Sequence, residues 1–299
     1  MKNIFVIGST NTDMVVKASQ FPLPGETRLG GKFFMSGGGK GANQAVAAAR
    51  SGGQVSFVTK LGRDIFGTEC LGSFKKENIN TEYVFFSEDE PSGTALIFVN
   101  EEGENMIVVA SGANSRLLPE DIDKVKNLDE ADIVLMQLEI PMETITYTAG
   151  IVKSNHQKII INPAPAQMLE DELLNGLFLI IPNETEAHLL TGITVMDVNT
   201  AAAAADVFLN KGVQHVIITM GSQGVYFQDR NKRLVVPAPQ VKAVDTTAAG
   251  DVFCGALSVA LTEEMGWDKA IEFAVQAATL SVTRLGAQSA IPYRKELNG

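Results

Sequence analysis

The sequence predicts an α/β fold with three layers, in which a mostly parallel sheet lies between two layers of helices. From about residue 132 onward, short apolar strands alternate with helical segments, which is typical of a parallel sheet covered on both faces. A β-hairpin at 92–111 lies outside this alternation and indicates a second, smaller sheet. The chain has 299 residues, 45% of them hydrophobic, so it can form a core of that size.

The first strand is predicted at residues 4–7, an apolar run that Gly8 closes. Asn11 and Asp13 follow at the carboxyl end of this strand, the edge where open parallel sheets bind ligands. Being two residues apart, their side chains would point the same way in an extended chain and could hold neighbouring hydroxyls of a polyol. The alternative is an Asx-turn, which uses the same residue types.

A glycine-rich turn at 36–43 precedes an alanine-rich helix that begins near Gln44. The turn fits a loose dinucleotide-binding fingerprint but has no clean strand directly before it, and Gly41 follows Lys40 where a P-loop needs Ser or Thr. We expect a tight turn in which the backbone approaches a ligand, with Lys40 and Asn43 within reach. A simple glycine hinge before a helix is the alternative.

Extended apolar segments at 14–16 and 33–35 flank a loop that contains two prolines, and the 92–111 hairpin is expected to pair with them. Together they predict a β-sheet lid, residues 10–35 and 92–111, over the carboxyl edge of the main sheet. The catalytic α/β domain would then consist of residues 1–9, 36–91 and 112–299. Exposed lid strands need a cover, and a second subunit is one way to provide it.

The remaining elements follow in order. Asp64 is the expected N-cap of a helix that runs to about residue 76, and Pro141 is expected to start another. Each strand of the main sheet ends in polar residues or glycine, so these ends define one functional edge. The other strands are predicted at 55–61, 83–86, 133–136, 159–161, 177–181 and 215–219, and the last helix at about 267–285.

Asn183 and Glu186 open one of these helices. Asn at the N-cap with Glu three residues later is a capping box, in which the two side chains bond the free backbone N–H groups. The same pair could hold a phosphate-bound Mg²⁺ through water. The two interpretations are compatible.

The segment 245–251 lies between an extended apolar pattern at 234–244 and a predicted helix from Val252. Its small residues Ala248, Ala249 and Gly250 would lie at the helix N-terminus, where free N–H groups and the helix dipole favour an anion. Asp251 beside such an anion site would suit a base that takes a proton from a hydroxyl. The alternative is an acid that only favours the positive end of the helix.

Composition excludes several classes of protein. The net charge is −11, with 24 basic and 35 acidic residues, which argues against nucleic-acid and acidic-membrane partners. Cys70 and Cys254 form no disulfide framework or metal cluster, and Cys254 is expected to be a packed thiol and not a nucleophile. No signal-peptide pattern or apolar run of the ~20 residues that span a bilayer is present, so we expect a cytoplasmic protein.

The segment Asp245–Asp251 resembles the D-T-x-[GA]-[AG]-G-D signature of the ribokinase family of sugar kinases. Further segments resemble motifs of this family in order and spacing, so the resemblance covers nearly the whole chain. These segments are Asn11–Asp13, Gly38–Gln44, Leu96–Asn100, Gly112–Asn114, Met136–Glu139, Asn162–Pro165 and Pro182–Glu186.

The resemblance implies ATP-dependent phosphorylation of the primary 5-hydroxyl of D-ribose. Asp251 would be the base, and the backbone of Ala248, Ala249 and Gly250 would form the anion hole. The implied sugar site consists of Asn11, Asp13, Gly39, Lys40, Asn43, Glu139 and Asp251. The implied nucleotide site consists of Asn183, Thr219, Gly221, Ser222, Gly224, Gly250 and Val275.

The resemblance also implies Mg²⁺ held through water by Glu186, an activating K⁺ and a homodimer formed through the lid. The implied K⁺ site consists of Asp245, Thr247, Ser281, Arg284, Gly286 and Ala290. Three positions depart from the family pattern. Ala290 lacks the oxygen of the Ser that family members often have there, and Val275 replaces a His that can contact adenine. Ala248 stands where the family more often has Gly, although the Ala form also occurs.

Two other functions stay open. A kinase of the same family could act on deoxyribose, a keto-sugar acid or a nucleoside. A non-catalytic sugar-binding protein is the alternative from a different class, and Asp251 beside an anion hole argues against it.

Overall fold

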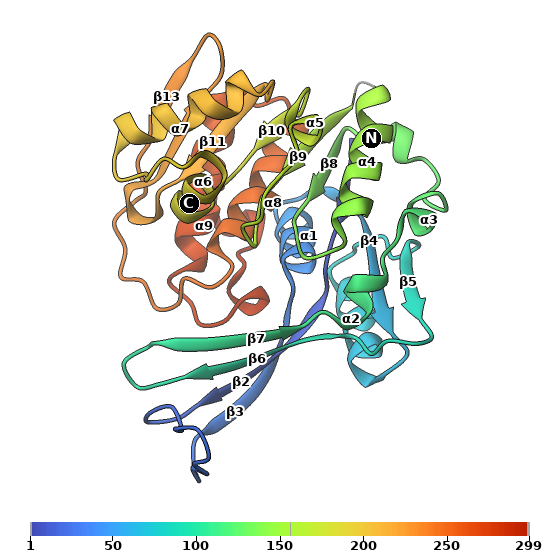
Figure 1. The fold of residues 1–299 in the computed structure, drawn as a ribbon, viewed down its shortest axis with the longest axis vertical. Coiled ribbons are helices and arrows are strands. Elements are labelled where there is room, and N and C mark those ends of the chain that lie inside the picture. Colours follow the sequence, from blue (N-terminus) through green and yellow to red (C-terminus); the bar gives the residue numbers. More distant parts are fainter. Residues whose placement is uncertain (1, 156, 298–299) are drawn as a thin grey trace.

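The computed structural model describes residues 2–155 and 157–297 and contains two sheets (Figure 1). The main sheet has nine strands in the order β13-β12-β11-β10-β9-β8-β1-β4-β5. Pairing is parallel from β5 to β11, whereas β12 and β13 are antiparallel. The mostly parallel sheet is therefore confirmed. Its strands are β1 Asn3–Ile7, β4 Gln54–Gly62, β5 Val84–Ser87, β8 Ile133–Met136, β9 Lys158–Ile161, β10 Leu179–Ile180, β11 His215–Thr219, β12 Val225–Gln228 and β13 Arg233–Val236.

Helices cover both faces of this sheet, and each face has its own apolar core. Ile4 and Val6 of β1 pack in the core that includes α1, α8 and α9, whereas Phe5 and Ile7 pack in the core with α4 and α7. This alternation is the period-2 pattern of a strand buried on both faces. The helices are α1 Lys40–Arg50, α2 Ile65–Lys76, α3 Pro119–Ile122, α4 Met142–Ser154, α5 Asp171–Leu174, α6 Glu184–Thr191, α7 Val198–Asn210, α8 Ala249–Thr262 and α9 Trp267–Ser281.

The second sheet projects from the α/β body at the bottom of Figure 1. It has the order β3-β2-β6-β7, with β2 Asn11–Lys17, β3 Lys32–Gly38, β6 Gly93–Val99 and β7 Asn105–Ala110. Strand β3 continues past the expected lid boundary at residue 35, because Gly38 still pairs with Asn11. We refer to these four strands as the lid sheet.

The structure differs from the sequence prediction in two places near α8 and α9. Strand β13 ends at Val236, and no strand runs through 237–247 into α8. Pro237 and Pro239 have no N–H for a strand ladder, which ends the strand there. Helix α9 ends at Ser281 instead of near residue 285. The N–H groups of Thr283 and Arg284 bond carbonyls only three residues back, and the carbonyl of Val282 accepts the N–H groups of Val244 and Asp245, so the helical pattern stops there.

Other local predictions are confirmed. Asp64 is the N-cap of α2 and accepts a hydrogen bond from the N–H of Gly67 at 2.8 Å. Pro141 directly precedes α4. Within the described ranges, no helix is long and apolar enough to cross a membrane.

Candidate active site

The first turn of α8 forms one wall of a cavity at the carboxyl edge of the main sheet. Ala248 is the N-cap and has a left-handed backbone, with a φ of 61°. A Cβ added at Gly250 would meet nothing within 4 Å, so open space lies beside this turn. The cavity has a volume of about 160 Å³, and its lining includes Lys40, Asn183, Glu186 and Asp251. A helix N-terminus that faces open space can receive an anion.

Asp251 lies in this turn and is 6% exposed. Its two carboxylate oxygens accept hydrogen bonds from different side-chain amides. Oδ2 accepts one from Nδ2 of Asn43 at 3.0 Å, and Oδ1 accepts one from Nε2 of Gln44 at 2.9 Å. Burial raises the pKa of Asp251, and Lys40 and the two amides partly oppose that rise. A carboxylate with a raised pKa is better able to accept a proton.

Glu139, which follows β8, is tied to the start of α1. Its Oε2 accepts the hydroxyl of Ser9 at 2.5 Å and the backbone N–H of Lys40 at 2.9 Å. Burial lowers the pKa of Lys40, but the nearby carboxylates of Asp251 and Glu139 outweigh that effect, so its pKa is raised overall. The ammonium of Lys40 is therefore held in its charged form among acids.

Asp13 belongs to the same group of acids. Burial, together with the charges of Glu139 and Asp251, raises its pKa to about 7. Asn11 and Asp13 both lie in β2, so their side chains share one face of an extended strand, which replaces the Asx-turn alternative. Nδ2 of Asn114 donates to Oδ1 of Asn11 at 2.8 Å and fixes that side chain.

The glycine-rich turn serves close packing between the lid sheet and α1. A Cβ at Gly38 would lie 2.2 Å from Oδ1 of Asp13. Gly39 has a φ of 86°, and its Cβ would lie 2.7 Å from the backbone N of Asn11. A larger residue at Gly38 would displace the side chain of Asp13, and one at Gly39 would displace the backbone at Asn11.

The residues expected to bind nucleotide lie at the neighbouring strand ends. Asn183 and Thr219 form a parallel bridge, and Thr219 begins the turn that contains Gly221 and Gly224. Both glycines have left-handed backbones, and a Cβ at Gly224 would lie 2.1 Å from the carbonyl oxygen of Val236. Val275 differs from this group, because it is 5% exposed and packs in the core around α9.

The capping box at the start of α6 is confirmed. Oδ1 of Asn183 accepts the N–H of Glu186 at 2.8 Å, and Oε2 of Glu186 accepts the N–H of Asn183 at 2.9 Å. Burial raises the pKa of Glu186, and its carboxylate lines the same cavity as Asp251. Capping and a role toward a phosphate-bound cation thus remain compatible.

The two parts of the expected K⁺ site lie together. Oδ1 of Asp245 accepts the N–H of Thr247 at 2.9 Å, and Oδ2 accepts the N–H of Gly286 at 2.9 Å. Although burial raises it, these hydrogen bonds hold the pKa of Asp245 below its usual range. The guanidinium of Arg284 instead donates to Glu296, and the side chain of Ala290 is buried without an oxygen to offer.

Cys254 is a packed thiol, as its place one turn after Asp251 predicts. It is 1% exposed, and burial raises its pKa well above the ordinary value. A thiol held in its protonated form is a poor nucleophile.

Comparison with known proteins gives a consistent assignment. The family model described as pfkB family carbohydrate kinase matches residues 1–294. The chain belongs to this family. A ribokinase from Haemophilus influenzae is 45% identical over 99% of this chain and 97% of its own length. A deoxyribokinase from Salmonella typhi is 38% identical over 99% of this chain and 97% of its own.

Among solved structures, Arabidopsis thaliana ribokinase complexed with ribose and ATP has a TM-score of 0.93 and 31% identity. The match covers 99% of this chain and 97% of the plant protein. The three-layer fold with a separate small sheet is therefore the fold of this pfkB-family relative as well.

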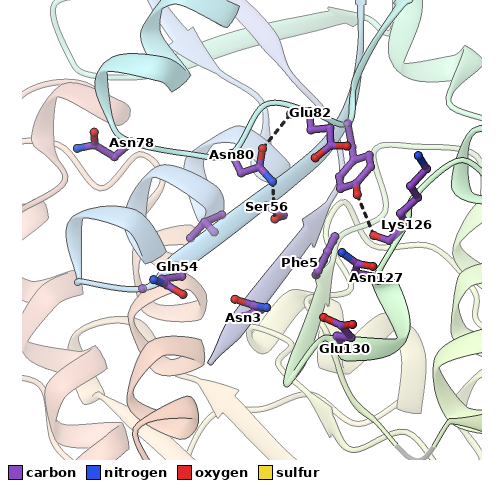
Figure 2. A pocket seen from close by; sticks show the side chains of 13 residues that line it. Asn3, Phe5, Gln54, Ser56, Asn78, Asn80, Glu82, Lys126, Asn127 and Glu130 are labelled. Atoms are coloured by element: carbon purple, nitrogen blue, oxygen red, sulfur yellow. Dashed lines mark hydrogen bonds between the residues drawn. The ribbon is translucent and has the colours of Figure 1, made fainter. Parts of the chain in front are cut away.

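A larger cavity lies at the opposite edge of the same sheet (Figure 2). Its volume is about 520 Å³, and it lies at the amino ends of β1 and β4, away from α8. Its lining residues bond one another: Nδ2 of Asn80 donates to the hydroxyl of Ser56 at 3.2 Å, and the hydroxyl of Tyr83 donates to the backbone carbonyl of Lys126 at 2.9 Å. Charged residues line both cavities: Glu82, Lys126 and Glu130 line the larger one. In this kinase family member, the smaller cavity holds the buried pair Lys40 and Asp251, each of which shifts the pKa of the other.

The structure also places at the site several polar residues to which the sequence pattern assigns no role. Gln44 contacts Asp251, Ser9 contacts Glu139, and Asn114 contacts Asn11. Gln137 and Asn162 follow β8 and β9 directly, and polar residues at strand ends were the available signal.

Proposed function

We propose that this protein transfers the γ-phosphoryl group of ATP to the primary 5-hydroxyl of D-ribose, forming ribose 5-phosphate. The observation that supports it most is Asp251, a buried carboxylate with a raised pKa beside the open N-terminus of α8. Membership of the pfkB family and the 45% identical ribokinase support the reaction and the sugar. The deoxyribokinase at 38% identity makes deoxyribose the second candidate substrate.

The proposal assigns the acids and amides around Lys40 to the sugar. Carboxylates accept hydrogen bonds from hydroxyls, and the amides of asparagine can donate and accept them. The proposed sugar ligands are Asn11, Asp13, Gly39, Lys40, Asn43 and Glu139. The proposed nucleotide ligands are Asn183, Thr219, Gly221, Ser222, Gly224 and Gly250, with Val275 contributing only apolar packing.

In the proposed reaction, Asp251 accepts the proton of the sugar 5-hydroxyl while the oxygen of that hydroxyl attacks the γ-phosphorus. The new O–P bond forms while the bond to the bridging oxygen of ADP breaks, and ADP leaves with that electron pair. The N-terminus of α8, at Ala248, Ala249 and Gly250, stabilises the negative charge of the phosphoryl oxygens. Positioning and charge stabilisation thus account for the rate.

Mg²⁺ and K⁺ belong to this proposal as expected cofactors. In the described part of the chain, no group of three or more His, Cys, Asp or Glu residues could hold a metal ion. Mg²⁺ commonly binds through one carboxylate, water and substrate phosphates, and Glu186 at the cavity wall suits that role. When bound, Mg²⁺ would neutralise phosphate charge. The turns around Asp245 and Gly286, joined by a hydrogen bond, would hold K⁺ through oxygens.

We also propose that residues 10–35 and 92–111 act as a lid, and that two copies pair through it. The lid sheet exposes apolar side chains, including Phe33 at 61%, Ile107 at 53% and Val108 at 68%. Exposed strands of this kind need a cover, and a second copy would supply one. Light scattering at micromolar concentration should give a dimer mass, and Val108→Glu should shift it toward the monomer. A monomeric wild type would contradict pairing.

A coupled assay of ADP release tests the function. Wild-type protein is mixed with ATP, Mg²⁺ and a panel of sugars, with and without K⁺. Ribose-dependent turnover that K⁺ increases is the expected result. Turnover with deoxyribose alone would keep the reaction and change the substrate. Folded protein that turns over no sugar would favour the sugar-binding alternative.

A further inference from the structure

Three buried amide side chains form a connected network behind Asp251. Nε2 of Gln44 donates to Oδ1 of Asp251 at 2.9 Å and to Oδ1 of Asn162 at 3.0 Å. Nε2 of Gln137 donates to Oε1 of Gln44 at 2.6 Å. Nδ2 of Asn162 donates to the carbonyl of Ile181 at 2.9 Å. The network therefore connects α1, the ends of β8 and β9, and the first turn of α8.

The direction of every amide in this network is determined by groups that only accept. The backbone carbonyl of Ile181 accepts, so the NH₂ of Asn162 faces it and the oxygen of Asn162 faces Gln44. The ionised carboxylate of Asp251 also accepts, so the NH₂ of Gln44 must face both Asp251 and Asn162. The oxygen of Gln44 is then left for Gln137, which supplies a donor.

Gln44 is 0% exposed, so it can act on a ligand only through its partners, of which Asp251 is the charged one. Asn43, the other amide on Asp251, differs because it belongs to the proposed sugar site. If Asn43 turns to a sugar hydroxyl, Gln44 stays as the donor that holds the carboxylate. Gln44 is thus the contact to Asp251 that does not depend on the sugar.

Close packing fixes where Gln44 lies. A Cβ at Gly255 of α8 would lie 2.6 Å from the backbone oxygen of Gln44, so the two helices touch through this glycine. A Cβ at Gly8 would lie 2.1 Å from Oε1 of Gln137, so Gln137 is packed against the backbone after β1. The backbone of Gln44 and the side-chain amide of Gln137 are therefore both held by close packing.

We propose that Gln44 is a positioning residue that orients the Asp251 carboxylate toward the sugar hydroxyl, and that Gln137 holds the Gln44 amide in the required direction. This inference rests on the proposed function, in which Asp251 is the base. A hydrogen bond from Gln44 leaves a lone pair of Asp251 aimed away from α1, and it favours the ionised form that can accept a proton.

Other charged and titratable groups act on Asp251, and Gln44 must be distinguished from them. They are Lys40 on α1, Glu139 after β8, Asp13 on β2, Glu186 on α6 and Cys254 on α8. All of them would stay in place in a Gln44 variant. A change in the titration of Asp251 would then report on the amide contact.

Gln44→Met tests the proposal, because it removes the donor and keeps a side chain of similar length. We expect kcat for ribose to fall on the order of 10- to 100-fold, the loss of one hydrogen bond to a charged group. We expect the acidic limb of the kcat profile to move up by about one pH unit. The KM for ribose should change less than about twofold, because Gln44 is not at the sugar.

Gln228→Met is the matched control. Gln228 is also buried and hydrogen-bonded, to Tyr226 and Asp206, but it lies on β12. The Gln228→Met variant should be less stable than the wild type, while the pH profile of its kcat should stay that of the wild type. Gln137→Met is the second variant: it leaves the Asp251 contact in place and should lower kcat roughly three- to tenfold, with a shift in the same direction. If Gln44→Met does not fold, Gln137→Met decides.

A ¹³C NMR titration of the Asp251 carboxyl separates this inference from the proposed function, because it needs no turnover. A higher pKa in Gln44→Met than in the wild type supports the proposal. An unchanged pKa together with an unchanged kcat profile in folded variants overturns it. Absence of ribose-dependent ADP release by the wild type would instead overturn the proposed function.

Discussion

The two edges of the main sheet both have cavities, and they differ in what lines them. At the carboxyl edge, Asp251 and Lys40 shift each other's pKa, and the charge of Asp251 adds to the burial that raises the pKa of Asp13. At the amino edge, the cavity is about three times larger by volume (about 520 against about 160 Å³), yet Asn80 and Tyr83 already bond groups of their own edge (Figure 2). Buried charged groups that shift each other's pKa, more than cavity volume, distinguish the carboxyl edge as the candidate active site.

Apart from changes at Asp251 itself, replacing Lys40 by Met should have the largest effect on this contrast. It removes a cation that lowers the pKa of Asp251, so charge on both the acids and the phosphates would be less stabilised. We expect kcat/KM to fall by about 10²- to 10³-fold and the acidic limb of the pH profile to move upward. Steady-state kinetics between pH 5 and 9 measure both. Lys126→Met at the amino edge is the matched control, and an equal loss there would contradict the contrast.

Replacing Asp13 by Asn should weaken sugar binding while it stabilises the fold. The folded protein holds the proton of Asp13 up to a pKa of about 7, against an ordinary value of 3.8. Between these values the folded state binds more protons than the unfolded state, so this group lowers stability as pH rises. The variant lacks that loss, so its gain in Tm over the wild type should grow from pH 5 to pH 8.

Thermal unfolding at the two pH values, without sugar, checks this prediction. A change of 1 kcal/mol in the free energy of unfolding corresponds to a change of about 2–4 °C in the Tm of a large domain. The KM for ribose should rise about tenfold or more, because a charged acceptor is lost. A variant that is less stable than the wild type at pH 8 would count against the raised pKa.

Replacing Gly250 by Ala should raise the stability of the protein while it lowers the activity. A Cβ at Gly250 meets no protein atom within 4 Å, so the helix should gain roughly 0.5–1 kcal/mol. The added methyl would occupy space beside the proposed anion site, and kcat/KM for ATP should fall about tenfold. Gly72→Ala in α2 is the matched control, because that position is also open. It should gain stability without losing activity, and equal activities for both variants would argue against the anion site.

Replacing Asn80 by Ala at the amino edge should have the smallest effect. The variant loses the hydrogen bond that Asn80 donates to Ser56 and the one that it accepts from the backbone N–H of Glu82, at a cost of about 1–2 kcal/mol in stability. Steady-state kinetics should stay within about twofold of the wild type. A larger loss of activity would mean that the two edges are coupled.

Local signals were enough to predict much of the fold. Asp64 before an apolar helix and the Asn183–Glu186 pair are caps whose partners lie three residues away, and both are confirmed. The predicted end of α9 was wrong because its cause is distant: the carbonyl of Val282 accepts the N–H groups of Val244 and Asp245, 38 and 37 residues earlier. Long-range contacts of this kind leave no periodic signal in the sequence.

The candidate site shows the same limit. Asp251 and Asn43 were expected at the site from glycine-rich turns at helix starts, and the structure joins them through a 3.0 Å hydrogen bond. Gln44 begins the alanine-rich helix and ends the Gly38–Gln44 segment of the resemblance, but the sequence assigns it no role at the site. Its contact with Asp251 spans 207 positions and depends on two helices meeting at Gly255, which no local pattern predicts.

Ribose-dependent ADP release by Asp251→Asn, compared with the wild type, tests the central claim most directly. The account predicts turnover by the wild type and a loss on the order of 10³-fold or more in the variant, because the proton acceptor is gone. Ribose should still raise the Tm of the variant, showing that the site is folded and occupied. A variant that keeps most of the wild-type kcat would contradict the assignment of Asp251 as the base.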